Sequence, residues 1–210
     1  MAEFEVVRTN RGPLEFIPVE LFHGRGAINP VQSARNLLDL SDILDKSRIS
    51  HGLIYGTLLG AVRDAAFIPW DEDVDVFIGD EDRSKLLDCL WELRDHGFEL
   101  VRCDGDLYSV MRDGDYVDIY VFRHVGARRW CNSDMLLGDH FNFDGRVEFL
   151  GRNFCCPAPT HEFLKLMYGE DWRTPRQNYP ARPWSAWRKF KRVLRDAFPK
   201  LAELYFKAFR

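Results

Sequence analysis

The stretch that decides the fold is residues 53–79, which read LIYGTLLGAVRDAAFIPWDEDVDVFIG. The apolar run 53–55 is closed by Gly56, and the segment from Thr57 to Arg63 has helical spacing. Gly56 and Thr57 are therefore predicted at a strand-to-helix turn. Towards the end of the stretch, valines alternate with aspartates, which is the two-residue period of a strand. The stretch thus predicts a strand, a helix and a second strand.

The flanking sequence predicts further helices and strands around this stretch. Asn29 followed by Pro30 has the pattern of a helix start, and Asp113 with Gly114 is a strong hairpin signal. The segment 123–145 shows no clear period and is predicted to be a long surface loop. The predicted helices cover 29–46, 81–96 and about 160–169, and the predicted strands cover 98–102, 107–112 and 116–122. The expected fold is mixed α/β with an antiparallel component.

The composition favours one globular domain. The chain has 210 residues, of which 46% are hydrophobic and 30% are charged, which is ample for a core without metal or disulfide staples. No run of about 18 apolar residues occurs, and the first ten residues lack the basic start and apolar centre of an export signal. The five cysteines form no Cys-x-x-Cys pair, a pattern typical of reduced thiols. We therefore expect a cytoplasmic protein.

The charge is unevenly distributed along the chain. The net charge is −4, yet residues 184–210 hold eight Lys and Arg against two acidic residues. Apolar residues recur at helical spacing in this segment, so an amphipathic basic helical tail is predicted. Such a tail either packs on the domain or contacts an anionic membrane at its cytoplasmic face. Nucleic acid is not an expected partner, because the rest of the chain is strongly acidic.

Acidic residues are concentrated just before and within the second strand. Asp71, Glu72, Asp73 and Asp75 place four acids in five positions. On a strand, Asp73 and Asp75 would share one face with Cα atoms about 7 Å apart. Two bare carboxylates ~4 Å apart repel by about 4 kcal/mol at an effective dielectric constant of 20. The pattern therefore calls for a cation or a shared proton.

A third carboxylate, Asp118, lies in a strand pattern between two β-branched residues. Burial of such an acid is costly unless it is paired or bound to a metal. Oxygen-only ligands suit Mg²⁺ or Mn²⁺, and backbone N–H groups of Gly56 and Thr57 at a helix start could hold a phosphate. Together with Asp73 and Asp75, these residues outline a phosphoryl-transfer site. The spacing alone is also compatible with a solvated strand edge.

The motif resembles the signature of the LicD and fukutin-related family within the nucleotidyltransferase superfamily. The resemblance is carried by Gly56–Arg63 and by Phe67–Val76. Downstream, residues 117–119 resemble the third acidic strand of the family, and residues 151–175 resemble its closing motif. The similarity spans about residues 50–175.

The resemblance implies a nucleotidyltransferase-like mixed sheet flanked by helices. It predicts an N-terminal extension over 1–28, a catalytic domain over 29–180 and the basic tail over 184–210. Two departures from the family pattern are present. Glu72 stands where Asp is common, and residues 64–66 read Asp-Ala-Ala in place of a frequent His-Gly-Gly.

The resemblance also implies an activity. Family members transfer a phosphorylated alcohol, such as phosphocholine, ribitol phosphate or glycerol phosphate, from a CDP-linked donor to a glycan hydroxyl and release CMP. The acceptor would be a cell-surface glycan or a lipid-linked oligosaccharide. Asp73, Asp75 and Asp118 match the acids that bind the metal and act in catalysis, and Gly56 and Thr57 match the turn that contacts the donor phosphates.

Three further residues are candidates for substrate contact. Arg63 is the fixed cation nearest to the acidic cluster in the sequence, and its planar guanidinium could hold a donor phosphate. The alternative for Arg63 is a salt bridge to Asp64 or Asp71. Asp71 itself and Lys165 are the other two candidates.

Two other functions remain open at this level. A nucleotidyltransferase that moves AMP or CMP from a nucleoside triphosphate to a small molecule or protein would use the same acids. A non-catalytic, membrane-associated scaffold could retain the fold without the chemistry. The leaving group separates the two enzymes, because one releases CMP and the other releases pyrophosphate.

Overall fold

The computed structural model describes residues 4–21, 26–125, 128–132, 134–137 and 144–177. Its central feature is a mixed sheet in the strand order β10-β11-β3-β4-β7-β6-β5, which β8 and β9 extend from the end of β7. The pairs β4–β7 and β11–β3 are parallel and the other pairs are antiparallel. The strands are β3 (His51–Leu53), β4 (Val74–Gly79), β5 (Glu99–Asp104), β6 (Leu107–Arg112), β7 (Asp115–Val125), β8 (Arg128–Cys131), β9 (Asp134–Leu137), β10 (Gly145–Phe149) and β11 (Arg152–Cys156).

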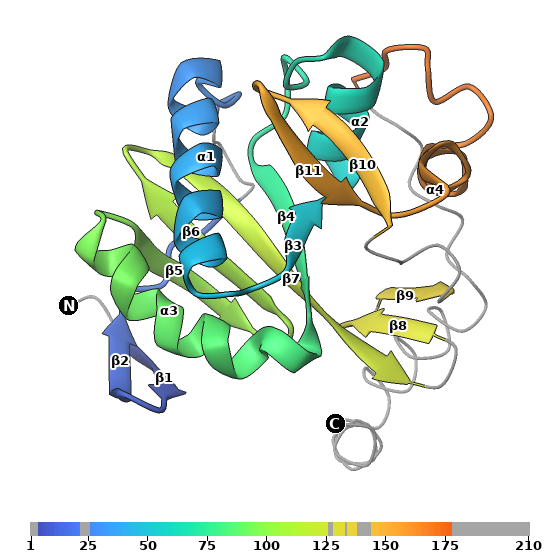
Figure 1. Ribbon diagram of the computed structural model, residues 1–210. Coiled ribbons are helices and arrows are strands. Elements are labelled where there is room, and N and C mark those ends of the chain that lie inside the picture. The colour runs from blue at the N-terminus through green and yellow to red at the C-terminus, as the bar shows by residue number, and fades with distance from the viewer. Residues whose placement is uncertain (1–3, 22–25, 126–127, 133, 138–143, 178–210) are drawn as a thin grey trace, which may run out of the picture.

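Helices cover the sheet unevenly. The helices are α1 (Pro30–Lys46), α2 (Tyr55–Asp64), α3 (Arg83–Asp95), which follows the short 3₁₀ turn η1 (Asp80–Asp82), and α4 (Thr160–Tyr168). Figure 1 shows α1 and α3 lying side by side over one face of the sheet. The predicted start of α1 is confirmed, because the Asn29 side chain accepts hydrogen bonds from the backbone N–H groups of Val31 and Gln32.

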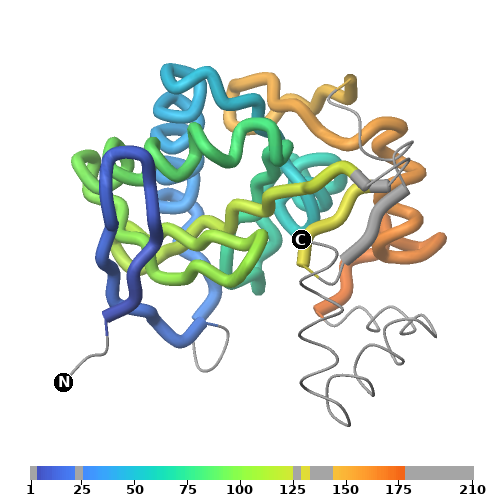
Figure 2. Tube along the Cα trace, turned by 90° about the horizontal axis from the view of Figure 1, so that it is seen from below, coloured from blue at the N-terminus to red at the C-terminus, as the bar shows by residue number. Residues whose placement is uncertain are grey.

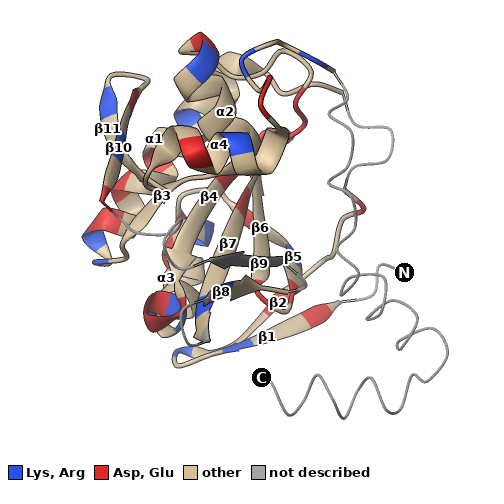
Figure 3. Ribbon diagram, turned by 90° about the vertical axis from the view of Figure 1, so that its right-hand side faces the viewer, with Lys and Arg blue, Asp and Glu red and all other residues tan. Residues whose placement is uncertain are grey.

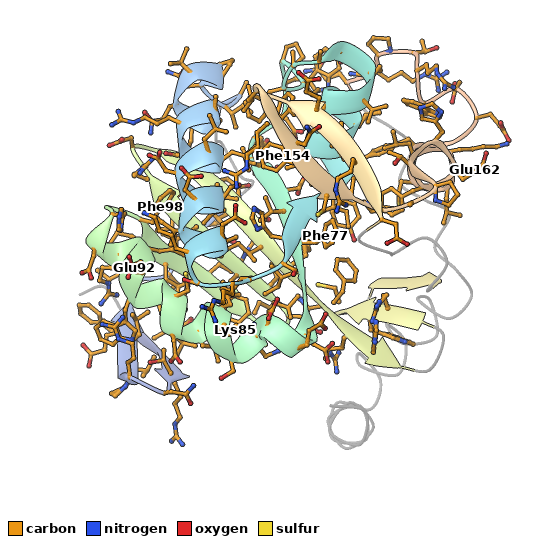
Figure 4. All side chains as sticks on the ribbon, viewed as in Figure 1. Phe77, Lys85, Glu92, Phe98, Phe154 and Glu162 are labelled. Atoms are coloured by element: carbon orange, nitrogen blue, oxygen red, sulfur yellow. The ribbon has the colours of Figure 1, made fainter. Side chains whose placement is uncertain are left out.

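The core lies on both faces of the central strands. Every residue of β4 is buried, as expected for a strand in the middle of a sheet that is covered on both sides. Figure 4 shows Phe77 of β4 and Phe154 of β11 in the interior, whereas Glu92 of α3 and Glu162 of α4 lie on the outside. A carboxylate in β4, such as that of Asp75, is therefore shielded from water.

The N-terminal segment forms a hairpin that packs on the domain. Strands β1 (Glu5–Thr9) and β2 (Gly12–Phe16) pair antiparallel and lie against α3 (Figure 2). The indole N–H of Trp91 in α3 donates to the Thr9 hydroxyl at 3.0 Å. Beyond the hairpin, the N–H of Val19 donates to the carbonyl of Val101 in β5 at 3.0 Å. The predicted N-terminal extension is thus joined to the sheet by hydrogen bonds.

Two sequence predictions are wrong in detail. The loop predicted over 123–145 contains the end of β7 and the hairpin of β8 and β9. These strands are only four residues long and have no clear alternation, so periodicity could not detect them. The apolar run 53–55 was predicted to be a strand that ends at Gly56. Only Leu53 belongs to a strand, because β3 ends at Leu53 and α2 begins at Tyr55.

Other predictions are confirmed or lie outside the described residues. The Asp113–Gly114 hairpin joins β6 and β7, with φ of 54° and 89° at the two turn residues, as this turn requires. The basic tail predicted over 184–210 falls among the residues that are not described. Among the helices that are described, none has both the length and the apolar character needed to cross a membrane.

Helix α2 ends in a backbone conformation that is unfavourable for the alanine found there. Ala65 caps the helix in the left-handed region with φ of 50°, where a Cβ atom costs about 1–2 kcal/mol. Ala65→Gly is expected to raise the free energy of unfolding by about 0.5–1 kcal/mol, since the gain exceeds the added entropy of the unfolded chain. Denaturant titration measures this difference. The matched control Ala66→Gly changes a residue without positive φ, and it should destabilise the chain; equal effects of both changes would contradict the argument.

Candidate active site

Three carboxylates converge where β4 begins. Asp71, Asp73 and Asp75 each offer one oxygen, and these oxygens all lie within 4.8 Å of one another. Asp73 and Asp75 are 8% and 5% exposed, and Asp71 is half-buried. The loop before β4 is held in place because the carbonyl of Asp71 accepts from the N–H of Ile28 at 2.9 Å. The predicted convergence of acids at this strand is present.

The N-terminus of α2 contacts this cluster through Asp75, and Figure 3 shows α2 and α4 together at one end of the sheet, next to β4. Asp75 Oδ2 accepts from the N–H groups of Gly56 at 2.9 Å and Thr57 at 3.4 Å, and the Thr57 hydroxyl accepts from the N–H of Asp75 at 2.8 Å. A Cβ atom at Gly56 would lie 2.3 Å from Asp71 Oδ2, so the close approach requires glycine. The two N–H groups predicted to bind phosphate therefore hold Asp75 in this structure.

Asp118 lies beside the cluster but is held by other partners. The parallel register of β4 and β7 places it opposite Asp75. Its Oδ1 accepts from the Ser109 hydroxyl at 2.6 Å, and its Oδ2 accepts from Arg102 Nη2 at 2.6 Å and from the Tyr120 hydroxyl at 3.4 Å. The metal set predicted as Asp73, Asp75 and Asp118 thus differs from the close group in the structure, where Asp71 takes the third place.

Burial dominates the electrostatics of these acids. It raises the pKa of Asp73 to about 8, with further contributions from Asp118 and Asp71, and it raises the pKa of Asp71 to about 6. The pKa of Asp75 is raised by burial and then by the charges of Asp73 and Asp71. Burial also raises the pKa of Asp118, although Arg102 and Ser109 act in the opposite direction. The cluster therefore favours protons or a cation over bare charge.

The residues present fit a hard divalent cation. The donors are carboxylate oxygens alone, which is the ligand set that Mg²⁺ and Mn²⁺ prefer. Glu72 adds a second indication, because its Oε2 atom is buried and has no hydrogen-bond partner among the described residues. A buried carboxylate oxygen without a partner is costly. A cation at the cluster would offset the repulsion among the three aspartates, and Glu72 lines the same cavity.

A cavity of about 390 Å³ opens on the cluster, within the size range of small-molecule sites. The four acids from Asp71 to Asp75 line it, and so do two aromatic residues, Trp70 before β4 and Tyr168 at the end of α4. Arg176 also lines the cavity and pairs with Asp171. The site therefore combines acidic, aromatic and basic groups in one pocket.

Two predicted substrate contacts lie elsewhere. Arg63 donates to both carboxylate oxygens of Asp64, so the salt bridge that was its alternative interpretation is the one observed. Lys165 pairs with Glu170 at 2.8 Å on the exposed side of α4. Neither residue lines the cavity. The structure does not bring either of them to the acidic cluster.

Sequence reasoning missed the cations that do lie at the site. Arg102 of β5 contacts Asp118, and Arg176 lines the cavity from beyond α4. Arg176 is next to the closing motif of the resemblance, which was the available signal. Arg102 had no comparable signal, because it lies in a short strand outside every motif.

The comparisons with known proteins agree with the fold. Residues 48–168 match the family described as LicD/FKTN/FKRP, nucleotidyltransferase domain. The solved structure of the antibiotic-resistance factor ANT(2'')-Ia resembles the chain with a TM-score of 0.50 at 12% identity, covering 87% of this chain and 93% of that one. This similarity shows the nucleotidyltransferase fold alone.

Two curated proteins are similar in sequence. The lipopolysaccharide cholinephosphotransferase LicD of Haemophilus influenzae is 39% identical over 112 residues, which are 52% of this chain and 41% of that protein. The uncharacterised protein RP689 of Rickettsia prowazekii is 38% identical over 110 residues, 50% of this chain and 40% of that protein. The matches thus span about two fifths of these relatives. Because the family match covers more than half of the sequence and includes the whole acidic cluster, the chain belongs to the LicD family.

Proposed function

We propose that the chain transfers a phosphorylated alcohol from a CDP-linked donor to a hydroxyl of a cell-surface glycan and releases CMP. The observation that carries the proposal is the buried cluster of Asp71, Asp73 and Asp75, which opens on a cavity of small-molecule size. Membership of the LicD family and the similarity to a lipopolysaccharide cholinephosphotransferase support this chemistry. Phosphocholine, ribitol phosphate and glycerol phosphate are the candidate groups.

The carboxylates of Asp71, Asp73 and Asp75 would hold Mg²⁺ or Mn²⁺. A bound divalent ion supplies positive charge to the phosphates and stabilises the charge that develops as CMP leaves. The protein itself positions the carboxylates. The N–H groups of Gly56 and Thr57 fix Asp75, and the buried partners of Asp118 fix a further carboxylate beside Asp73.

The donor and the acceptor are proposed to meet in the cavity. Trp70 and Tyr168 line it, and their rings could hold an alcohol headgroup by stacking or cation–π contact. Arg176 lies at the same cavity and offers a guanidinium for a donor phosphate. The attacking hydroxyl of the glycan then displaces CMP from the distal phosphorus of the donor.

The experiment that tests this function is a donor panel. Purified chain with Mg²⁺ or Mn²⁺ is incubated with CDP-choline, CDP-ribitol and CDP-glycerol, and CMP release is followed with and without a glycan acceptor. Metal-dependent CMP release from at least one donor is expected. Incubation with ATP or CTP is the control, since pyrophosphate release there, without CMP release from any CDP-alcohol, would contradict the proposal and favour a nucleotidyltransferase. Absence of both products and of Mn²⁺ binding would favour a non-catalytic scaffold.

A further inference from the structure

Four polar residues form one row across adjacent strands, on the face of the sheet away from α1. Asp75 of β4 lies opposite Asp118 of β7, Asp118 lies opposite Ser109 of β6, and Ser109 lies opposite Arg102 of β5. Directly opposed residues on neighbouring strands point to the same face and are close enough to interact. The row therefore leads from the acidic cluster to a cation two strands beyond Asp118.

A bulge in β5 brings Arg102 to this face. The register pairs Leu100 with Val110 but Arg102 with Ser109, so Val101 is an extra residue in β5. Without the bulge, strict alternation would put Arg102 on the face of Leu100, which packs in the main core. Bulges commonly re-aim a side chain beside an active site. Here the bulge converts a core-facing position into one that reaches Asp118.

The three residues Arg102, Ser109 and Asp118 close a ring of hydrogen bonds. Arg102 donates through Nε to the Ser109 hydroxyl at 2.8 Å and through Nη2 to Asp118 Oδ2 at 2.6 Å. The Ser109 hydroxyl in turn donates to Asp118 Oδ1 at 2.6 Å. Asp118 and Ser109 are both 0% exposed, so neither oxygen of the carboxylate can turn towards water. The orientation of Asp118 is thus fixed at two points.

We propose that Arg102 and Ser109 are positioning residues for the transfer reaction: together they hold the Asp118 carboxylate in a fixed orientation at the edge of the Asp71–Asp73–Asp75 cluster. The inference rests on the proposed function and extends it to two residues outside the family motifs described above. This positioning requires the planar guanidinium of Arg102 and not only its charge, because a single ammonium group cannot reproduce the two contacts made by Nε and Nη2.

The test uses two conservative variants of the full chain. Arg102→Lys keeps the positive charge but loses the two-point contact, and Ser109→Ala removes both hydrogen bonds of the hydroxyl, to Arg102 and to Asp118, without changing charge. Each is expected to lower kcat by ~10-fold or more while KM for the donor changes by less than about threefold, because orientation of a catalytic group affects the chemical step more than ground-state binding. A merely structural role would instead make activity follow the melting temperature.

Two further measurements separate positioning from other effects. Mn²⁺ affinity by calorimetry should stay within about threefold of wild type in both variants, because the three carboxylates proposed to hold the ion, Asp71, Asp73 and Asp75, are unchanged. In an Asp118→Asn background, Arg102→Lys should cause no further loss of kcat, since residues that act as one unit are not additive. Full additivity of the two changes would overturn the inference.

The matched control is Arg112→Lys on the neighbouring strand β6. Arg112 is also mostly buried and also donates through Nε and Nη2 to two side chains, Asn36 at 2.8 Å and Asp39 at 2.7 Å, but it lies on the face towards α1. It should lower stability and leave kcat unchanged. If the wild type is active and both Arg102→Lys and Ser109→Ala keep its kcat, the inference is wrong but the proposed function stands. A wild type that releases no CMP from any CDP-alcohol would overturn the proposed function and the inference with it.

Discussion

Asp73→Asn is expected to lower turnover at least ~100-fold while the chain still folds. The amide has nearly the same shape as the carboxylate, so packing around this buried residue is retained, but the change removes one of three close oxygens that carry charge to the cation. The metal-free variant should be at least as stable as wild type at pH 8, because the amide needs no proton to be buried. Initial rates of CMP release and thermal melts measure the two effects.

The same loss is expected for Asp75→Asn and Asp118→Asn, and we extend it to Asp71→Asn because Asp71 belongs to the close group. The control is Asp95→Asn at the end of α3, where the residue is exposed and does not line the cavity. Turnover near the wild-type value in any cluster variant would remove that residue from the proposed chemistry.

Mn²⁺ affinity is expected to rise at least about 100-fold between pH 6 and pH 8. In the metal-free chain burial raises the pKa of Asp73 to about 8, so a bound ion must displace a proton from this carboxyl below pH 8. Displacement of one proton strengthens apparent binding about tenfold per pH unit over this range. Calorimetry in buffers of different ionisation enthalpy measures both the affinity and the number of protons released.

The stability of the metal-free chain should change in the opposite direction. An Asp in the unfolded chain loses its proton near pH 4, whereas folded Asp73 keeps it up to about pH 8. Its contribution to the free energy of unfolding is therefore fully present below about pH 4 and is lost as the pH rises to about 8. The increase in melting temperature on adding Mn²⁺ should be larger at pH 8 than at pH 6. Asp73→Asn should abolish most of this difference, and an equal Mn²⁺ effect at both pH values would contradict the assignment.

Local sequence signals were sufficient to predict those features of the fold that one or two residues determine. The Asn29 cap predicted the start of α1, and Asp113–Gly114 predicted the turn between β6 and β7. The alternation around Asp73 and Asp75 predicted β4, and the β-branched neighbours of Asp118 predicted that it lies in a strand. The LicD resemblance supplied the family, which the match over residues 48–168 confirms.

Features set by tertiary pairing could not be predicted in this way. Hairpin β10–β11 is a separate case, because β10 does alternate between polar and apolar residues from Arg146 to Phe149 and the turn at Leu150 and Gly151 has positive φ; this local signal was available and was not used. The partner of Asp118 depended on the register between β5 and β6, which no local pattern encodes. The partner of Arg63 was open because two acids lay within reach in the sequence, and only the structure shows the pair with Asp64.

The extra residue in β5 also affects how distant relatives should be compared with this chain. A homologue with a regular strand there would carry the equivalent cation one position earlier, so a gap-free alignment would set Arg102 against an inward apolar side chain. Its apparent variability across such alignments would then reflect a length difference of one residue and not a loss of the basic group. Superposition of backbones, which matches positions by their place opposite Ser109, avoids this error.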